Sequence, residues 1–237
     1  MKKIFLIIFA VFIVNSIFSQ TILYPIVNIK SHKTLTIEKI EFSETQTVFY
    51  MSIENQKTTP GDAWFCADEK IYIKNAKGTE MFFMTKSEGI PVCPDAYKFK
   101  KPGDILKFKL YFQKIPTSIK EIDIVENCND NCFYFYGVIL DETQNTEIKL
   151  FEKGVTLYST KNNEDALKCF EELIITVKDE NSNIYAYSLY IVPLICYELG
   201  ENEKAKNGFY KLKKSAIKDK DYFVNKLIKT EFFKNLE

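Results

Sequence analysis

The spacing of apolar positions along the chain changes once, near residue 141. Before that point apolar and polar side chains tend to alternate, as they do in residues 34–42 and 105–112. A period of 2 is typical of a strand that buries one face. After it, apolar positions recur with a period of 3.6, which indicates amphipathic helices. The chain is therefore predicted to be α+β, with a β-rich domain followed by a helical domain.

The β-rich domain is predicted to span residues 33–142. Seven of its segments are rich in Ile, Val, Phe, Tyr and Thr, and turn signals with Pro, Gly, Asn or Asp separate them. Many short strands with frequent turns favour an antiparallel β-sandwich, immunoglobulin-like in a loose sense, with a small closed barrel as the alternative. The segments are residues 34–42, 47–53, 70–74, 80–85, 105–112, 119–125 and 132–140.

The helical domain, residues 146–237, repeats one hairpin pattern. Ala166 and Phe170 recur as Ala205 and Phe209, and each pair lies 39 residues apart (205 − 166). A small residue and an aromatic residue at fixed places predict helix pairs that pack as a repeat. We expect a first helix around residues 148–158, then helices over residues 164–177, 186–199 and 203–217, and a terminal capping helix over residues 221–236.

This pattern resembles the tetratricopeptide repeat family, in which small residues and one aromatic residue let two helices pack closely. The residues that match its packing positions are Gly154, Ala166, Phe170, Ala205 and Phe209. The chain departs from the family in its period, which is usually 34 residues, and in having Pro193 where the first copy has Gly154. The resemblance covers about a third of the chain and implies a module that binds proteins or peptides.

The resemblance also implies a binding groove along the first helix of each pair. Tyrosine suits such a surface because it offers contact area and a hydrogen-bonding tip at small entropic cost. The alternative is that the same row packs against the β domain or against the capping helix. The row consists of Ile148, Phe151, Val155, Tyr158, Tyr187, Tyr190, Leu194 and Tyr197.

Residues 118–126 and 133–138 carry a second resemblance. They look like the end of an uncharacterised exported bacterial β-sandwich module that accompanies diverse domains. This resemblance implies a fold and export, and it implies no activity.

The N-terminus predicts export. Lys2 and Lys3 precede an apolar run over residues 4–14, which is short for a membrane span and typical of a signal peptide. We expect a signal peptide over residues 1–19 with cleavage after Ser19, or else after Ser16, and an N-terminal segment over residues 20–32. An uncleaved anchor is the alternative. The mature chain is expected to have no membrane span and to be periplasmic, secreted or on the cell surface.

Export changes the interpretation of the six cysteines, because thiols outside the cytoplasm tend to pair. Cys128 and Cys132 flank a predicted hairpin loop, so we expect them to be bridged. Cys66 and Cys93 are the second predicted pair. A zinc site built from these four cysteines is the alternative. Two further cysteines in the helical domain, Cys169 and Cys196, are expected to be buried core residues, with a third bridge as the alternative.

The charge balance and the sequence motifs limit the functions that the chain is expected to have. The 32 basic residues are all lysines and balance 32 acidic ones, so nucleic acid is not an expected partner. His32 is the one histidine and is expected to be solvated on the surface, and common catalytic motifs are absent from the sequence. We therefore expect no catalytic residue, no metal and no cofactor.

These observations favour an exported, non-enzymatic adaptor or scaffold that binds an unknown protein or peptide of the cell envelope. Two alternatives stay open. One is a structural component of a surface assembly. The other is a hydrolase or inhibitor module that acts on extracellular polymers through the β-domain loops, which would require convergent carboxylates near Trp64.

Overall fold

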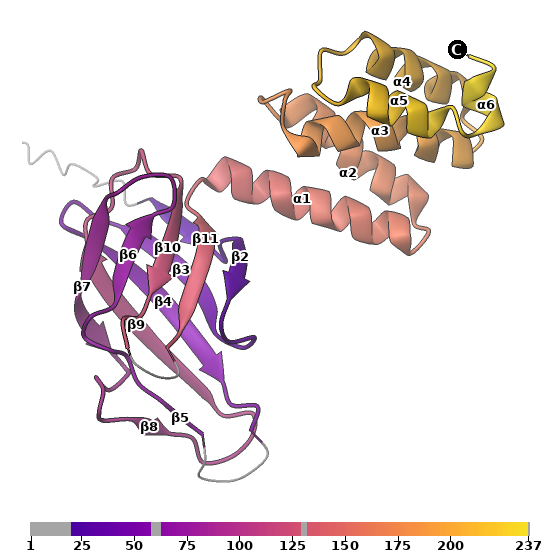
Figure 1. The fold of residues 1–237 in the computed structure, drawn as a ribbon. Coiled ribbons are helices and arrows are strands. Elements are labelled where there is room, and N and C mark those ends of the chain that lie inside the picture. The colour runs from indigo at the N-terminus through magenta and orange to yellow at the C-terminus, as the bar shows by residue number, and fades with distance from the viewer. Residues whose placement is uncertain (1–19, 58–62, 129–131, 237) are drawn as a thin grey trace, which may run out of the picture. The chain divides into compact units, whose positions relative to one another are not determined.

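The computed structural model describes residues 20–57, 63–128 and 132–236. The chain divides between Leu140 and Asp141 into an N-terminal β unit and a C-terminal helical unit, which are described separately (Figure 1). The predicted α+β class is confirmed at this level. The predicted signal peptide and the tip of the predicted hairpin at residues 129–131 lie outside the described residues.

The β unit contains one large antiparallel sheet and one small ribbon. The sheet has nine strands in the order β1-β3-β4-β9-β7-β6-β10-β11-β2, and the ribbon pairs β5 with β8. The strands are β1 (Thr21–Leu23), β2 (Val27–Lys30), β3 (Thr36–Phe42), β4 (Gln46–Glu54), β5 (Trp64–Phe65), β6 (Tyr72–Asn75), β7 (Met81–Glu88), β8 (Tyr97–Lys98), β9 (Ile105–Gln113), β10 (Glu121–Val125) and β11 (Tyr134–Ile139).

The sheet curls at β7. The first residues of this strand pair with β6, and the residues from Met84 onward pair with β9, with a register shift between Met84 and Lys86. A bulge of this kind bends a strand and increases its local twist. Figure 1 shows the result: β6, β10 and β11 lie over β3, β4 and β9.

The segment of residues 20–32 contributes two strands to the sheet. It forms β1 and β2, which are the opposite edges of the sheet. The backbone N–H of Tyr24 still donates to Glu38 on β3, whereas the C=O of Ile26 already accepts from Ile139 on β11. Since residues 24–26 are all that separates the two strands, the edges of the curled sheet approach each other here.

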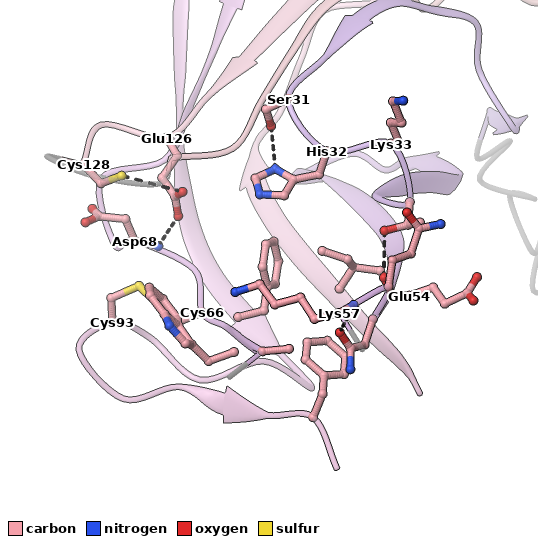
Figure 2. A pocket seen from close by; sticks show the side chains of 18 of the residues that line it. Ser31, His32, Lys33, Glu54, Lys57, Cys66, Asp68, Cys93, Glu126 and Cys128 are labelled. Atoms are coloured by element: carbon pink, nitrogen blue, oxygen red, sulfur yellow. Dashed lines mark hydrogen bonds between the residues drawn. A yellow bond between two sulfur atoms is a disulfide. The ribbon is translucent and has the colours of Figure 1, made fainter. Parts of the chain in front are cut away.

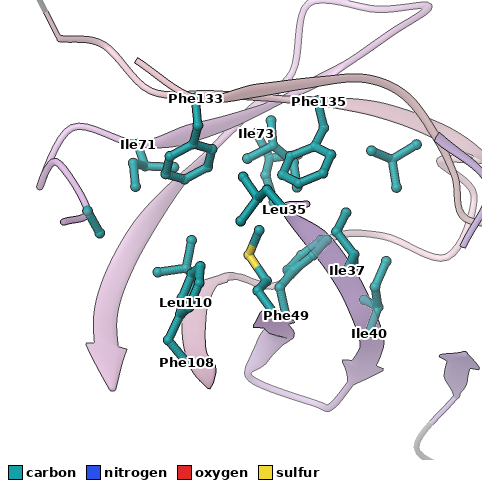
Figure 3. Close-up of a cluster of buried hydrophobic side chains, with 14 of the residues drawn as sticks. Leu35, Ile37, Ile40, Phe49, Ile71, Ile73, Phe108, Leu110, Phe133 and Phe135 are labelled. Atoms are coloured by element: carbon teal, nitrogen blue, oxygen red, sulfur yellow. The ribbon is translucent and has the colours of Figure 1, made fainter. Parts of the chain in front are cut away.

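Apolar side chains from both halves of the sheet form one core. Phe49 of β4 and Phe112 of β9 are fully buried and meet edge to face, with ring centroids 5.4 Å apart. Phe135 of β11 and Ile73 of β6 belong to the same cluster, and Figure 3 shows both across from Phe49. Each buried side chain of this size contributes roughly 1.5–3 kcal/mol relative to its exposed state. The apolar positions of the alternating sequence pattern thus form the inner face of the curled sheet.

The helical unit contains six helices within the described residues. Helix α1 begins at Glu142, earlier than the predicted domain start, because the side chain of Asp141 caps it by accepting a hydrogen bond from the N–H of Gln144. The predicted capping helix over residues 221–236 is instead two short helices, since Thr230 has extended backbone angles. The helices are α1 (Glu142–Ser159), α2 (Asn163–Thr176), α3 (Asn183–Glu198), α4 (Asn202–Lys214), α5 (Lys220–Leu227) and α6 (Glu231–Lys234).

The two helix pairs use the small residues differently. In the first pair, a Cβ placed on Gly154 of α1 would lie 3.0 Å from the Phe170 ring of α2, so the glycine permits the close approach. In the second pair, Pro193 of α3 is buried, and a Cβ on Gly208 of α4 would lie 3.2 Å from it. In the second pair the small residue at the contact is therefore Gly208 of the second helix, whereas in the first pair it is Gly154 of the first helix. Ala166, Phe170, Ala205 and Phe209 are all fully buried.

Candidate functional site

The β unit contains a cavity of about 780 Å³ beside β5. The only histidine and the only tryptophan of the chain, His32 and Trp64, both line it. Figure 2 shows His32, Glu126 and sulfur atoms of both disulfides around it. A large concave site with a few polar groups is the default candidate for ligand binding. Other lining residues are Lys33, Glu54, Lys57, Phe65, Asp68 and Phe99.

His32 is half-buried in the cavity wall, so it is less solvated than the predicted surface residue. Its Nδ1 lies 2.8 Å from the hydroxyl of Ser31, and its ring stands edge-on to Phe65 with centroids 6.1 Å apart. Burial lowers the pKa of His32 below its ordinary value. Burial therefore favours the neutral imidazole, which can both donate and accept a hydrogen bond.

Glu126 is a buried acidic residue, with 7% of its surface exposed. Its Oε1 accepts a hydrogen bond of 2.8 Å from the N–H of Asp68, and its Oε2 accepts one of 2.9 Å from the N–H of Phe133. Burial raises the pKa of this carboxyl above its ordinary value, and the two N–H donors oppose the rise. The side chain thus fastens two separate segments of the chain beside the cavity.

Two disulfides frame the same region. Cys66 is bonded to Cys93, 27 residues away, and Cys128 is bonded to Cys132, four residues away. Because all four sulfurs are in disulfides, none is a thiolate for the four-cysteine zinc site considered above. The sulfurs of Cys128 and Cys132 lie within 4.8 Å of a carboxylate oxygen of Glu126, but for the same reason this group offers no thiolate to a metal.

Disulfides are typical of proteins outside the cytoplasm, so the two bonds are consistent with an extracellular or periplasmic location. Over residues 20–57, 63–128 and 132–236, none of the helices has the length and apolar character that crossing a bilayer requires.

The predicted groove on the helices is in part occupied by the chain itself. Tyr197 stacks on Phe232 of the C-terminal segment, with ring centroids 4.8 Å apart, and Tyr190 lies 5.3 Å from Phe223 of α5. This is the arrangement foreseen in the alternative, in which the terminal residues cover the row. Tyr197 nevertheless keeps 37% of its surface exposed.

The first part of the row packs between helices. Tyr187 lies edge-on to Phe151 at 5.4 Å, and the hydroxyl of Tyr158 donates a hydrogen bond of 2.8 Å to Glu198. Burial, followed by this hydrogen bond, raises the pKa of Tyr158. Val155 is exposed, whereas Ile148 and Leu194 are half-buried. The row therefore offers isolated exposed positions and no continuous free surface among the described residues.

The two remaining cysteines, Cys169 and Cys196, are buried free thiols. Burial raises the pKa of Cys196 to about 11, which makes it a poor nucleophile near neutral pH. They serve as small core residues, and the structure has no third bridge between them.

Sequence reasoning missed the cavity because its walls come from segments far apart in the chain. One signal was present: the rarest residues, His32 and Trp64, precede residue 140, as do the four bridged cysteines. Nothing in the sequence marked Glu126 as buried. No family model, curated protein or solved structure matches this chain, so a function has to be argued from the cavity itself.

Proposed function

We propose that this chain is an exported, non-enzymatic binding protein of the cell envelope, and that a peptide or a segment of a partner protein binds in the β-unit cavity. The observation that carries the proposal is the cavity of about 780 Å³ that both disulfides frame. Its volume lies within the range of pockets that hold small molecules or a few peptide residues.

The lining supports a peptide because it combines aromatic surface with charges of both signs. Phe65 and Phe99 are buried in the wall, while Trp64 keeps 51% of its surface exposed. Tryptophan is enriched among the residues that dominate binding energies. Lys57 and Glu54 are exposed at the same cavity and would complement opposite charges on a bound chain.

The disulfides support binding through rigidity. Cys66 follows Trp64 by two residues, and its bond to Cys93 holds the short β5 strand to the segment that follows β7. A wall fixed before the ligand arrives loses less conformational entropy on association, which favours affinity.

Two finer assignments of the fold are also proposals. We retain the immunoglobulin-like sandwich for the curled β unit and the tetratricopeptide-like pair for α1–α4. The helical row is the second candidate surface, through the exposed parts of Val155 and Tyr197. The stacking of Tyr197 on Phe232 favours the cavity over the row as the main site.

Peptide selection with matched variants tests this proposal. The purified protein would be used to select binders from a random displayed-peptide library, and the affinity of a synthetic binder would be measured by calorimetry. Trp64→Ala should weaken binding at least tenfold. Phe83→Ala is the control, because Phe83 is 50% exposed in the same unit and does not line the cavity; it should change affinity less than twofold.

Other outcomes would count against the cavity. Failure to select any peptide, or equal affinities for the wild type and Trp64→Ala, would overturn the proposal. Loss of binding in Tyr197→Ala with none in Trp64→Ala would place the site on the helical row instead.

A further inference from the structure

The Cys128–Cys132 disulfide lies at the edge of the cavity. Cys128 lines the cavity, and both cysteines of the pair are partly exposed. The bond closes a ring of residues only four apart in sequence. A short ring restricts the unfolded chain little, so such a bond adds less to stability than one that closes a long loop.

The second disulfide provides a contrast within the same molecule. Cys66 is buried, and its bond to Cys93 spans 27 residues. Exchange requires a thiolate to approach a sulfur in line with the bond that breaks, so burial slows it. Cys93, in contrast, is partly exposed. The two bonds therefore differ in loop length and in the exposure of one cysteine: both residues of the short ring are partly exposed, against one residue of the long loop.

A carboxyl group is held beside the short-ring disulfide. Oε2 of Glu126 lies 3.9 Å from Sγ of Cys128, a contact drawn in Figure 2. The backbone N–H groups of Asp68 and Phe133 fix the two carboxyl oxygens. The sulfur of a disulfide carries no hydrogen, so any proton shared between these two atoms belongs to Glu126.

We infer that the Cys128–Cys132 disulfide is a redox-active site that accepts two electrons from a pair of thiols on a partner peptide or protein, with Glu126 as the proton donor to Cys128, while Cys66–Cys93 is structural. The inference goes beyond the proposed binding function, because thiol–disulfide exchange needs an encounter with a thiol and no stable complex.

The exchange balances in two steps. A partner thiolate attacks Sγ of Cys132; the Cys128–Cys132 bond breaks, its electron pair stays on Sγ of Cys128, and that sulfur takes the carboxyl proton of Glu126. The second partner thiolate then attacks the partner sulfur of the mixed disulfide and releases Cys132 as a thiolate, which water protonates. The partner dithiol becomes a disulfide, Cys128 and Cys132 become thiols, and Glu126 regains a proton from solvent.

The environment of Glu126 supports this role. Burial raises its pKa, so a larger fraction of the carboxyl carries a proton in mildly acidic solution than an exposed glutamate would. Asp68 acts in the same direction through its charge. The other titratable and charged groups that line the cavity are His32, Lys33, Glu54 and Lys57.

Selective reduction tests the main claim. The purified protein would be equilibrated in glutathione buffers of decreasing potential, thiols would be blocked with an alkylating reagent, and each cysteine would be assayed by peptide mass spectrometry. Cys128–Cys132 should be half-reduced at a ratio of reduced to oxidised glutathione at least tenfold lower than Cys66–Cys93, with Trp64 fluorescence still native. Simultaneous reduction of the two bonds, or reduction only with unfolding, would overturn the inference.

Single-cysteine variants test which sulfur meets the partner. Cys128→Ser leaves the thiol of Cys132, and Cys132→Ser leaves that of Cys128. With oxidised glutathione as the probe, the Cys128→Ser protein should form a mixed disulfide at least fivefold faster than the matched variant. Equal rates, or the reverse order, would overturn the assignment of Cys132 as the exchanging sulfur.

The role of Glu126 is tested by the pH dependence of a ratio of two reduction rates. The pH dependence of the reductant itself cancels in this ratio. A water-soluble phosphine would reduce the wild-type protein between pH 5 and 8, and the rate for Cys128–Cys132 would be divided by the rate for Cys66–Cys93. The ratio should fall at least threefold as pH rises and Glu126 loses its proton, and Glu126→Gln should make it flat. If that variant does not fold, the wild-type profile decides: a flat ratio overturns the proton-donor role.

Discussion

The two units use the same kinds of side chain in opposite ways. In the β unit, four cysteines form two disulfides and aromatic residues surround an open cavity. In the helical unit, two cysteines are buried thiols, and Tyr190 and Tyr197 of the aromatic row pack against the chain's own C-terminal residues. The difference shows that an aromatic row on a helix face does not by itself identify a binding surface, because the chain can cover that row with its own next element.

The largest expected effect concerns the separate cores. Phe209 is fully buried in the helical cluster, so Phe209→Ala should cost the helical unit roughly 3–5 kcal/mol. Urea unfolding followed by circular dichroism at 222 nm reports on the helices, and Trp64 fluorescence reports on the β unit, since Trp64 is the only tryptophan. We expect the first transition to shift and the second to stay. The control, Tyr210→Ala, removes a partly exposed neighbour and should cost less than about 1 kcal/mol. Equal shifts of both transitions would show that the units unfold together.

The two disulfides should differ in their contribution to the β unit. In the chain-entropy model, a bond that closes a loop of the length of Cys66–Cys93 contributes about 3.5 kcal/mol, and one the length of Cys128–Cys132 about 2 kcal/mol. We therefore expect the double serine variant of the first pair to lower the urea midpoint of Trp64 fluorescence more than that of the second pair. Comparison of the variants checks the order, and a larger loss from the short ring would contradict it.

The helical unit was the more predictable of the two because its signals are local. Each helix shows its period within its own sequence, and Ala166, Phe170, Ala205 and Phe209 are buried as their spacing indicated. The errors in the predicted helices lie at the ends of helices. An aspartate cap extended α1 toward the N-terminus, and extended backbone at Thr230 divided the last helix. Both depend on single residues, which a period averaged over several turns does not resolve.

The β unit was less predictable because its edges depend on pairing between distant segments. Strands β1 and β2 have three and four residues, too few to display alternation, and they exist through pairing with β3 and with β11, more than 100 residues beyond β2. The candidate site was hidden for the same reason. His32 follows β2 and Glu126 follows β10, and the two residues become neighbours of one cavity because both strands pair with β11. Burial of a glutamate has no sequence pattern of its own.

A smaller effect tests whether the helical row is closed. Tyr197 stacks on Phe232 and lies 5.9 Å from Phe233. Aromatic pairs of this kind contribute about 0.5–1.5 kcal/mol beyond the area they bury, so Tyr197→Ala should destabilise the helical unit by about that amount or slightly more. Thermal unfolding at 222 nm measures it. Val155→Ala is the control at an exposed position of the same row and should have an effect within about 0.5 kcal/mol. No loss in Tyr197→Ala would indicate an open surface.

The smallest effect compares two tyrosine–glutamate pairs, one in each unit. In the β unit, the hydroxyl of Tyr50 donates to Glu41 at 2.7 Å, and this bond is the main reason that the pKa of Tyr50 rises to about 12. In the helical unit, burial is the main reason that the pKa of Tyr158 is raised, and its bond to Glu198 comes second. Glu41→Gln should therefore return the pKa of Tyr50 most of the way to its ordinary value, whereas Glu198→Gln should leave that of Tyr158 clearly raised.

Titration of the tyrosine ring carbons by NMR would measure both changes, and a larger shift at Tyr158 than at Tyr50 would contradict the assignment of causes.

The pKa shifts of these pairs also determine how the stability of each unit changes with pH. A raised tyrosine pKa adds stability that is complete below about pH 10 and is lost as pH rises through the folded-state pKa. The pKa of Glu41 is lowered, first by its hydrogen bond from Lys39 and then by that from Tyr50, so its contribution is present above its unfolded pKa and is lost as pH falls. Glu41→Gln should consequently weaken the loss of β-unit stability in both acid and alkali, because the Glu41 carboxylate bonds to both Lys39 and Tyr50. Glu198→Gln should leave most of the loss of helical-unit stability in alkali that Tyr158 causes.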